Sequence, residues 1–139
     1  MYLWDKGNKT HDSILSFTCD RDRYYDERLA PYDIVGCMAH VVMLEKCGLL
    51  RSDEKGRLIN GLSVLFSESG KGKLQIGREY EDIHSYVEFR LRDIAGEAAG
   101  KVNTGRSRND QIITDIYMWL RHQSSMLAGE LKKLTSLFL

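Results

Sequence analysis

The sequence has few of the residues that mark secreted, zinc-binding or nucleic-acid-binding proteins. Its three cysteines, Cys19, Cys37 and Cys47, are too few and too scattered for a disulfide framework, and none lies at C-x-x-C or zinc-ligand spacing. Twenty basic residues balance twenty acidic ones, which argues against a nucleic-acid or membrane-surface partner attracted by bulk charge. We therefore expect reduced thiols in a cytoplasmic protein that binds neither nucleic acid nor a membrane.

Long apolar runs and nucleotide-binding loops are missing as well. No stretch reaches the ~18 apolar residues of a membrane span, and the start of the sequence lacks the apolar segment of a signal peptide. Neither the G-x-G-x-x-G nor the G-x-x-x-x-G-K-[ST] pattern occurs. The composition that remains, with 42% hydrophobic and 29% charged residues, is typical of a soluble globular domain.

Apolar residues recur at helical spacing, which predicts a mainly α protein. The predicted helices run from Pro31 to about Lys46, from Ser52, from Glu81 and from Ser107. Pro31 is expected in a first turn, where its missing N–H is tolerated, and Gly48 just past the end of that helix. Residues 1–27 are polar and are expected to be irregular, residues 67–72 to form a loop, and residues 73–76 to form a linker.

The segment after Ser107 is long and carries a single apolar stripe. The stripe consists of Ile113, Ile116, Leu120, Leu127, Leu131, Leu134 and Phe138. Thirty helical residues would span ~45 Å, which is long for a helix of a small domain. The stripe therefore predicts partner helices that this sequence does not contain, and the apolar end without a helix stop signal predicts that the sequence is part of a longer protein.

The stretch Thr104-Gly105-Arg106-Ser107-Arg108-Asn109-Asp110-Gln111 gathers groups that suit a carboxylate-rich ligand. Arg106 and Arg108 offer planar guanidinium groups, and Asn109 offers both a donor and an acceptor. Ser107 and Asp110 fit a capping box, so a helix should begin here with its unpaired N–H groups and positive dipole end. The same residues also suit a capped helix start with solvated arginines, and spacing alone leaves both interpretations open.

Asp82 and His84 lie at the predicted start of the third helix. On an ideal helix two residues two positions apart point in different directions, which favours a capping carboxylate and a surface histidine. If the first turn is not yet helical, both side chains can face one pocket, where the carboxylate would raise the pKa of the imidazole and keep it available as a cationic contact. The sequence does not decide between the two arrangements.

Several of these segments resemble signatures of one enzyme family. Thr104–Gln111, Glu81-Asp82-Ile83-His84, Arg28-Leu29-Ala30-Pro31-Tyr32-Asp33-Ile34, Ala39-His40 and Leu3-Trp4 are similar, in the same order, to segments of the argininosuccinate lyases of the fumarase/aspartase superfamily. One departure is Cys37, where many members have serine; a small buried thiol can replace that hydroxyl. The resemblance covers nearly the whole sequence but only the first part of these enzymes, which are several times longer.

The resemblance implies a mainly α fold and a β-elimination. The fold would be an N-terminal helical domain, residues 1–106, followed by the first long helix of a central helical bundle, residues 107–139. The family cleaves argininosuccinate to arginine and fumarate, in arginine biosynthesis, without a metal or organic cofactor, and its sites form where subunits of a homotetramer meet. The general acid and base would lie beyond residue 139, so we expect no catalytic acid or base here and no activity from the isolated chain.

The family match also predicts which residues contact the small-molecule substrate. They are Asp26, Asp82, His84, Thr104, Arg106, Ser107, Arg108 and Asn109. Arg106 has a structural alternative, a contact with the C-terminus of a neighbouring helix, and Asp26 could instead be a surface acid. Asp22 stands where many relatives have serine, which leaves one polar contact unassigned.

Two other functions are compatible with the same motifs. A non-catalytic structural relative, similar to the lens crystallins that resemble argininosuccinate lyases, could keep both signatures. Another superfamily lyase, acting on adenylosuccinate or aspartate, is disfavoured because the Thr104–Gln111 signature is specific. In the family the acid and base groups are a histidine and a serine that follow the part resembled here, and their presence would discriminate an active enzyme from the structural relative.

Overall fold

The computed structural model describes residues 11–72 and 74–138, apart from a few side chains near the start of the first helix. These residues form four α-helices, α1 (Asp12–Lys46), α2 (Ser52–Gly70), α3 (Ile83–Ala95) and α4 (Arg108–Ser136), and a short 3-10 helix, η1 (Gly96–Lys101). No strand occurs in the described part of the chain. The predicted mainly α class is therefore confirmed. The Leu3-Trp4 match and the side chains of Asp22 and Cys19 lie outside what is described.

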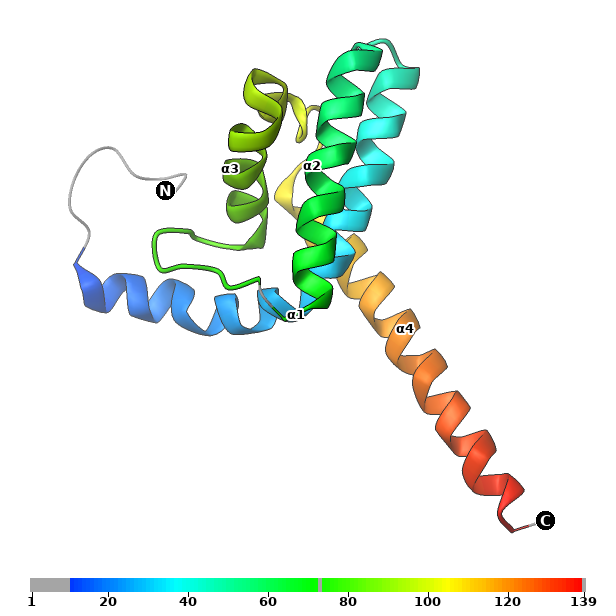
Figure 1. Ribbon diagram of the computed structural model, residues 1–139. Coiled ribbons are helices and arrows are strands. Elements are labelled where there is room, and N and C mark those ends of the chain that lie inside the picture. The colour runs from blue at the N-terminus through cyan, green and yellow to red at the C-terminus, as the bar shows by residue number, and fades with distance from the viewer. Residues whose placement is uncertain (1–10, 73, 139) are drawn as a thin grey trace.

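Helix α1 is longer than the sequence predicted. It begins at Asp12 and is capped by His11, whose side chain accepts a hydrogen bond from the Ser13 N–H at 3.3 Å. The prediction of an irregular segment over residues 1–27 is therefore wrong from residue 12 onward. Pro31 lies inside the helix rather than in its first turn. Because proline lacks an N–H and crowds the preceding turn, the helix bends: its blue and cyan parts run in different directions in Figure 1.

Long-range contacts hold the part of α1 that precedes the bend. The Arg23 Nε donates to the carbonyl of Tyr80 at 3.0 Å, and the Asp26 carboxylate accepts from the N–H of Ile83 at 3.0 Å. These partners lie 57 residues away in sequence, so no local pattern could reveal them. At its other end α1 stops as predicted, because Gly48 adopts a φ of 74° and the N–H groups of Gly48 and Leu49 bond back to Glu45 and Leu44.

The core lies where α1, α2 and α3 pack together. Its largest fully buried apolar side chains are Ile34, Val41, Leu44, Leu58, Leu62, Leu65, Ile83, Val87, Leu91 and Val102. Helices α2 and α3 come so close that a Cβ added at Gly61 would lie 2.7 Å from the Leu91 Cδ2. Helix α2 continues to Gly70, so the loop predicted over residues 67–72 is confined to its last two residues. Residues 74–76 have no regular secondary structure, in agreement with the predicted linker.

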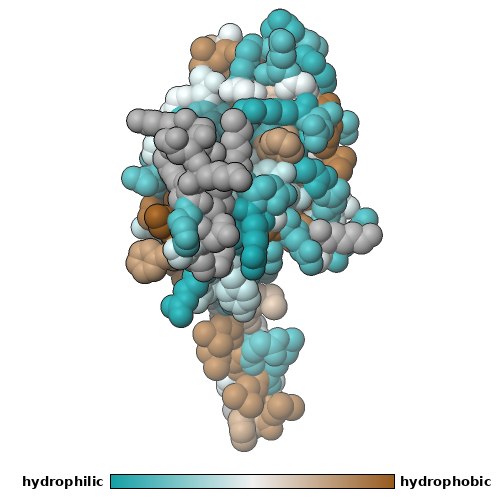
Figure 2. Space-filling view, turned by 90° about the vertical axis from the view of Figure 1, so that its left-hand side faces the viewer, coloured by the Kyte–Doolittle hydropathy of each residue, from teal (hydrophilic) through white to brown (hydrophobic). Residues whose placement is uncertain are grey.

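Helix α4 begins with the predicted capping box and then leaves the rest of the fold. The Asn109 N–H donates to the Ser107 Oγ at 2.7 Å, and the Ser107 N–H donates to the Asp110 Oδ2 at 3.2 Å. Figure 1 shows the later turns of α4 projecting alone, and Figure 2 shows apolar side chains gathered along that projecting part. The apolar stripe remains largely exposed, with Leu127 at 62% and Leu131 at 54%.

The described helices, α4 included, are all too short or too polar to cross a bilayer. The division into residues 1–106 and 107–139 remains a prediction, although α4 begins close to the proposed boundary.

Candidate functional site

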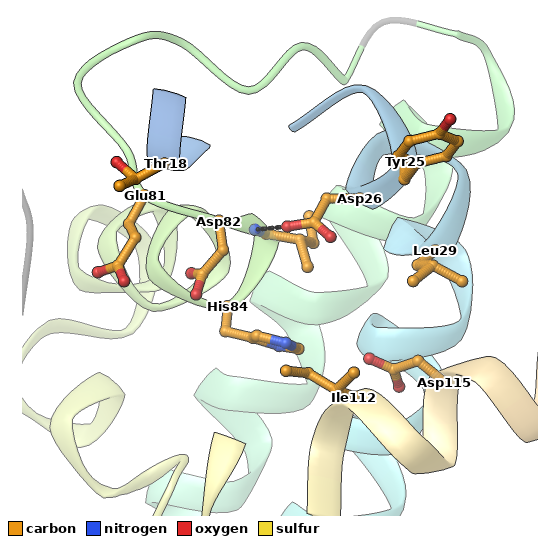
Figure 3. A pocket seen from close by; sticks show the side chains of 10 residues that line it. Thr18, Tyr25, Asp26, Leu29, Glu81, Asp82, His84, Ile112 and Asp115 are labelled. Carbon is orange, nitrogen blue, oxygen red and sulfur yellow. Dashed lines mark hydrogen bonds between the residues drawn. The ribbon is translucent and has the colours of Figure 1, made fainter. Parts of the chain in front are cut away.

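A pocket of about 360 Å³ opens between α1, the start of α3 and the first turns of α4 (Figure 3). It is lined by Thr18, Tyr25, Asp26, Leu29, Glu81, Asp82, Ile83, His84, Ile112 and Asp115. Three residues predicted from the sequence, Asp26, Asp82 and His84, are thus brought together from segments more than fifty residues apart. Four of the lining side chains are acidic, so the pocket suits a ligand with a cationic group.

The N–H groups at the start of α3 bind two of the carboxylates that line this pocket. Asp82 is the N-cap residue, and its Oδ1 accepts from the Ser85 N–H at 2.8 Å and from the Ser85 hydroxyl at 2.7 Å. The Asp26 carboxylate accepts from the first N–H of the same helix, that of Ile83. Both carboxylates therefore sit where unpaired N–H groups and the helix dipole stabilise negative charge. Asp26 is no isolated surface acid, and Asp82 both caps α3 and faces the pocket.

His84 is buried rather than on the surface. Its side chain is 4% exposed, and its Nδ1 lies 2.9 Å from the Oδ1 of Asp33, which is 1% exposed. Burial alone would lower the pKa of His84, but the hydrogen bond to Asp33 and the negative charges of Asp33, Asp82 and Asp115 outweigh it and raise the pKa. The imidazole is therefore charged over a wider pH range than a free one. The surface-histidine alternative is wrong.

Asp115 is a site residue that the sequence did not predict. It lies on α4, is 2% exposed, and its Oδ2 has no hydrogen-bond partner among the described residues. Burial and the neighbouring charge of Asp33 raise its pKa to about 7, against the opposing effect of the charges of His84 and Arg106. Asp33, His84 and Asp115 offer ligand atoms within 4.8 Å of one another, a set that could hold a metal ion although we expected none.

The first turns of α4 face the fold with polar groups, which is why Asp115 was missed. Gln111 and Asp115, four residues apart, are the buried residues of this helix, whereas the apolar stripe points elsewhere. The apolar periodicity predicts that the stripe packs against the fold. Within the described residues, however, α4 packs against the fold through Gln111 and Asp115. A polar i, i+4 pair opposite an apolar stripe was the only signal available.

The raised pKa of Asp115 predicts a pH-dependent stability effect. In the unfolded chain this carboxyl ionises near pH 3.9, whereas in the folded chain its pKa is about 7. The free energy of unfolding is therefore highest below pH 3.9 and falls as the pH rises toward 7. Asparagine does not titrate, so Asp115→Asn escapes this loss. The free energy of unfolding of Asp115→Asn minus that of the wild type should be larger at about pH 8 than at about pH 5. Urea unfolding at both values checks this, with the exposed Asp93→Asn as control. An equal difference at the two pH values would contradict the shift.

Arg108, the first residue of α4, joins the start of this helix to the rim of the pocket. Its Nη1 pairs with Asp82 and lies 3.4 Å from the Oε2 of Glu81, while its Nη2 donates to the Ser85 hydroxyl at 2.9 Å. Arg108 itself does not line the pocket, but two of its acidic partners do. A ligand carboxylate that entered here could compete with Asp82 for the guanidinium.

Arg106 points into the fold instead of toward the pocket. Its Nη2 donates to the Cys37 Sγ at 3.0 Å and to the Asn103 Oδ1 at 3.1 Å, and its buried Nε has no partner among the described residues. The structural alternative for Arg106 is thus favoured, although the contact is with a side chain of α1 and not with a helix terminus. Burial and the charge of Asp33 raise the pKa of the Cys37 thiol to about 12, so this thiol stays protonated.

The other predicted residues of the Thr104–Gln111 stretch, Thr104, Ser107 and Asn109, are not among the residues that line the pocket. Ser107 is engaged as the cap of α4, and the Thr104 carbonyl accepts from the His40 Nε2 at 3.0 Å. Thr104 and Asn109 are exposed. Their predicted contacts with the substrate therefore stay predictions. Cys37 and Cys47 are both free thiols, as expected.

Comparison with known proteins gives the same family as the motifs. A family model described as lyase matches residues 8–139. The argininosuccinate lyase of Ruthia magnifica is 45% identical over 111 residues, which are 80% of this chain and 23% of that protein. That of Phocaeicola vulgatus is 38% identical over 132 residues, 95% of this chain and 30% of that protein. The chain thus spans less than a third of the length of these relatives. It belongs to the lyase family and, within that family, resembles the argininosuccinate lyases.

Proposed function

We propose that this chain is the N-terminal part of an argininosuccinate lyase and supplies contacts to the substrate of a β-elimination that releases arginine and fumarate. The observation that carries the proposal is the pocket that Asp26, Asp82 and His84 line together, with Arg108 paired to Asp82 at its rim. Argininosuccinate carries three carboxylates, an amino group and a guanidinium, so it needs both kinds of contact that meet here.

Each kind of group has a chemical counterpart in the substrate. The carboxylates of Asp26 and Asp82 suit a guanidinium or an amino group, because such pairs form charge-assisted hydrogen bonds. Arg108 suits a carboxylate, because its planar guanidinium can donate two parallel hydrogen bonds to an anion. A β-elimination also builds up negative charge on a carboxylate, which nearby cationic donors stabilise. We propose that the acid and base that move protons belong to a part of the enzyme that this chain does not include.

Assembly and location are part of the same proposal. The exposed apolar stripe of α4 supports packing against helices of other subunits, consistent with a homotetramer whose sites are shared. The free thiols support a cytoplasmic location. A crystallin-like structural relative is not favoured, since the similar proteins are named as lyases.

A chimera tests the proposal. We would replace the 132 matching residues of the Phocaeicola vulgatus enzyme with those of this chain and follow fumarate formation by ultraviolet absorbance. The chimera should turn over argininosuccinate within about tenfold of the unmodified enzyme, a difference of about 1.4 kcal/mol in activation free energy. The isolated chain, as control, should be inactive. A folded, assembled chimera without turnover would contradict the proposal, as would turnover by the repurified isolated chain.

A further inference from the structure

His84 is hydrogen-bonded to Asp33 on the side of its ring that faces away from the pocket. Asp33 is not among the residues predicted to contact the substrate. Asp33, on α1, approaches the imidazole Nδ1 with its Oδ1 at 2.9 Å, and both side chains are almost completely buried. The Gln111 Nε2 donates to the same Oδ1 at 3.4 Å, so α4 also braces this carboxylate. Three helices therefore fix one hydrogen bond at the back of the pocket.

That hydrogen bond determines what the other ring nitrogen can do. The Asp33 Oδ1 already accepts from the Gln111 amide, and an acceptor oxygen calls for an N–H on the imidazole side, so we assign the proton of the pair to Nδ1 of His84. The Nε2 has no hydrogen-bond partner among the described residues, while the ring lines the pocket (Figure 3). Once the ring is charged, Nε2 also carries a proton and becomes a donor directed at a ligand.

The groups around the ring favour its charged form. The carboxyl groups of Asp33 on α1, Asp82 at the start of α3 and Asp115 on α4 all act on the ring, and the guanidinium of Arg106 acts on Asp115. Burial opposes the charge but does not prevail, and the pKa of His84 is raised. A charged donor in an otherwise acidic pocket provides a local contact for an anionic group.

We propose that Asp33 is a positioning residue that fixes the Nδ1 proton of His84 and presents its Nε2–H to a carboxylate of the ligand. The identity of that ligand rests on the proposed function, but the arrangement of the ring and its proton does not. Asp33 touches no ligand itself and acts only through His84.

Imidazole nitrogen NMR on the 139-residue chain tests the arrangement directly. Long-range proton–nitrogen correlations should show that His84 keeps its Nδ1 proton when it becomes neutral. Asp33→Asn should lower the pKa of His84 by about 1 unit or more, a tenfold or larger loss of proton affinity. The exposed Asp93→Asn, on the same helix as His84, should leave that pKa unchanged.

Each unfavourable result overturns the inference. If neutral His84 in the wild type carries its proton on Nε2, the inference is wrong. This measurement needs only the wild-type chain and therefore decides even if Asp33→Asn fails to fold. An unchanged pKa of His84 in a folded Asp33→Asn would overturn the inference as well. Titration with Zn²⁺ alone separates the metal-site alternative, because saturation of His84 at micromolar Zn²⁺ would mean that the three side chains act as ligands. No shift of the His84 nitrogens is expected under that condition.

The pH profile of the chimera adds a functional readout that a merely structural role would not move. A protonated donor is lost as pH rises through its pKa, so the alkaline limb of kcat/KM should move to lower pH in Asp33→Asn. A limb that does not move would contradict the positioning role. If the chimera is inactive, the proposed function fails while the NMR result still decides on Asp33.

Discussion

Replacing Arg108 by alanine in the active chimera is expected to lower kcat/KM for argininosuccinate by about 10- to 150-fold. The expected loss corresponds to one charge-assisted contact, about 1.5–3 kcal/mol. Arg108 is held at the pocket rim by Asp82, Glu81 and Ser85, so it needs only a small rotation to meet a ligand carboxylate. Steady-state rates of fumarate release provide the measurement.

Two comparisons separate a substrate contact from a structural one. Arg121→Ala removes an exposed arginine from the same helix and should leave kcat/KM unchanged. Arg108→Lys keeps the charge but loses the planar fork, so it should recover only part of the activity. If Arg108→Ala keeps the kcat/KM of the parent chimera while its Tm falls, Arg108 serves only to pin the start of α4 to α3. The same reasoning applies to Asn109→Ala.

The 139-residue chain is expected to self-associate through the exposed stripe of α4. Leu127, Leu131 and Leu134 are each at least half exposed, and burying such a side chain contributes roughly 1.5–3 kcal/mol. Two or three of them approach the whole stability of a typical domain, about 5–15 kcal/mol. Sedimentation should therefore find dimers or larger species at tens of micromolar, and the double variant Leu127→Glu/Leu131→Glu should be monomeric.

A matched variant on the same helix controls for charge. Lys132→Glu alters the charge of α4 at an exposed position outside the stripe, and it should leave the association unchanged. A wild-type chain that stays strictly monomeric at this concentration, with α4 ordered, would show that the stripe is not an association surface. Concentration-dependent Tm values offer an independent check, because association shifts apparent stability.

The helices that sequence reasoning located correctly are those with local signals. Ser52–Glu54 and the capping box of Ser107 and Asp110 mark the starts of α2 and α4, and Gly48 marks the end of α1. The first half of α1 has no such signal, since its charges alternate and Pro31 looks like a first-turn residue. That part is stabilised by contacts such as Arg23 with Tyr80, which only the folded chain creates.

The candidate site divides in the same way. Asp26, Asp82 and His84 could be predicted from family motifs, and the structure gathers them in one pocket. Asp33 and Asp115 could not be given roles, because their partners come from three helices and a buried carboxylate resembles a surface acid in the sequence. For Arg106 the motif placed the residue near the site, but only packing against α1 shows that its guanidinium points inward.

A crystal structure of the chimera with fumarate and arginine bound is the most direct test of the substrate site. The arginine guanidinium should lie in the acidic pocket beside Asp26, Arg108 should have turned from Asp82 to a carboxylate of the ligands, and the Nε2 of His84 should lie within hydrogen-bond distance of a ligand carboxylate. Ligands bound elsewhere, with Arg108 still paired to Asp82 and no ligand atom in the pocket, would contradict the proposed role of this chain.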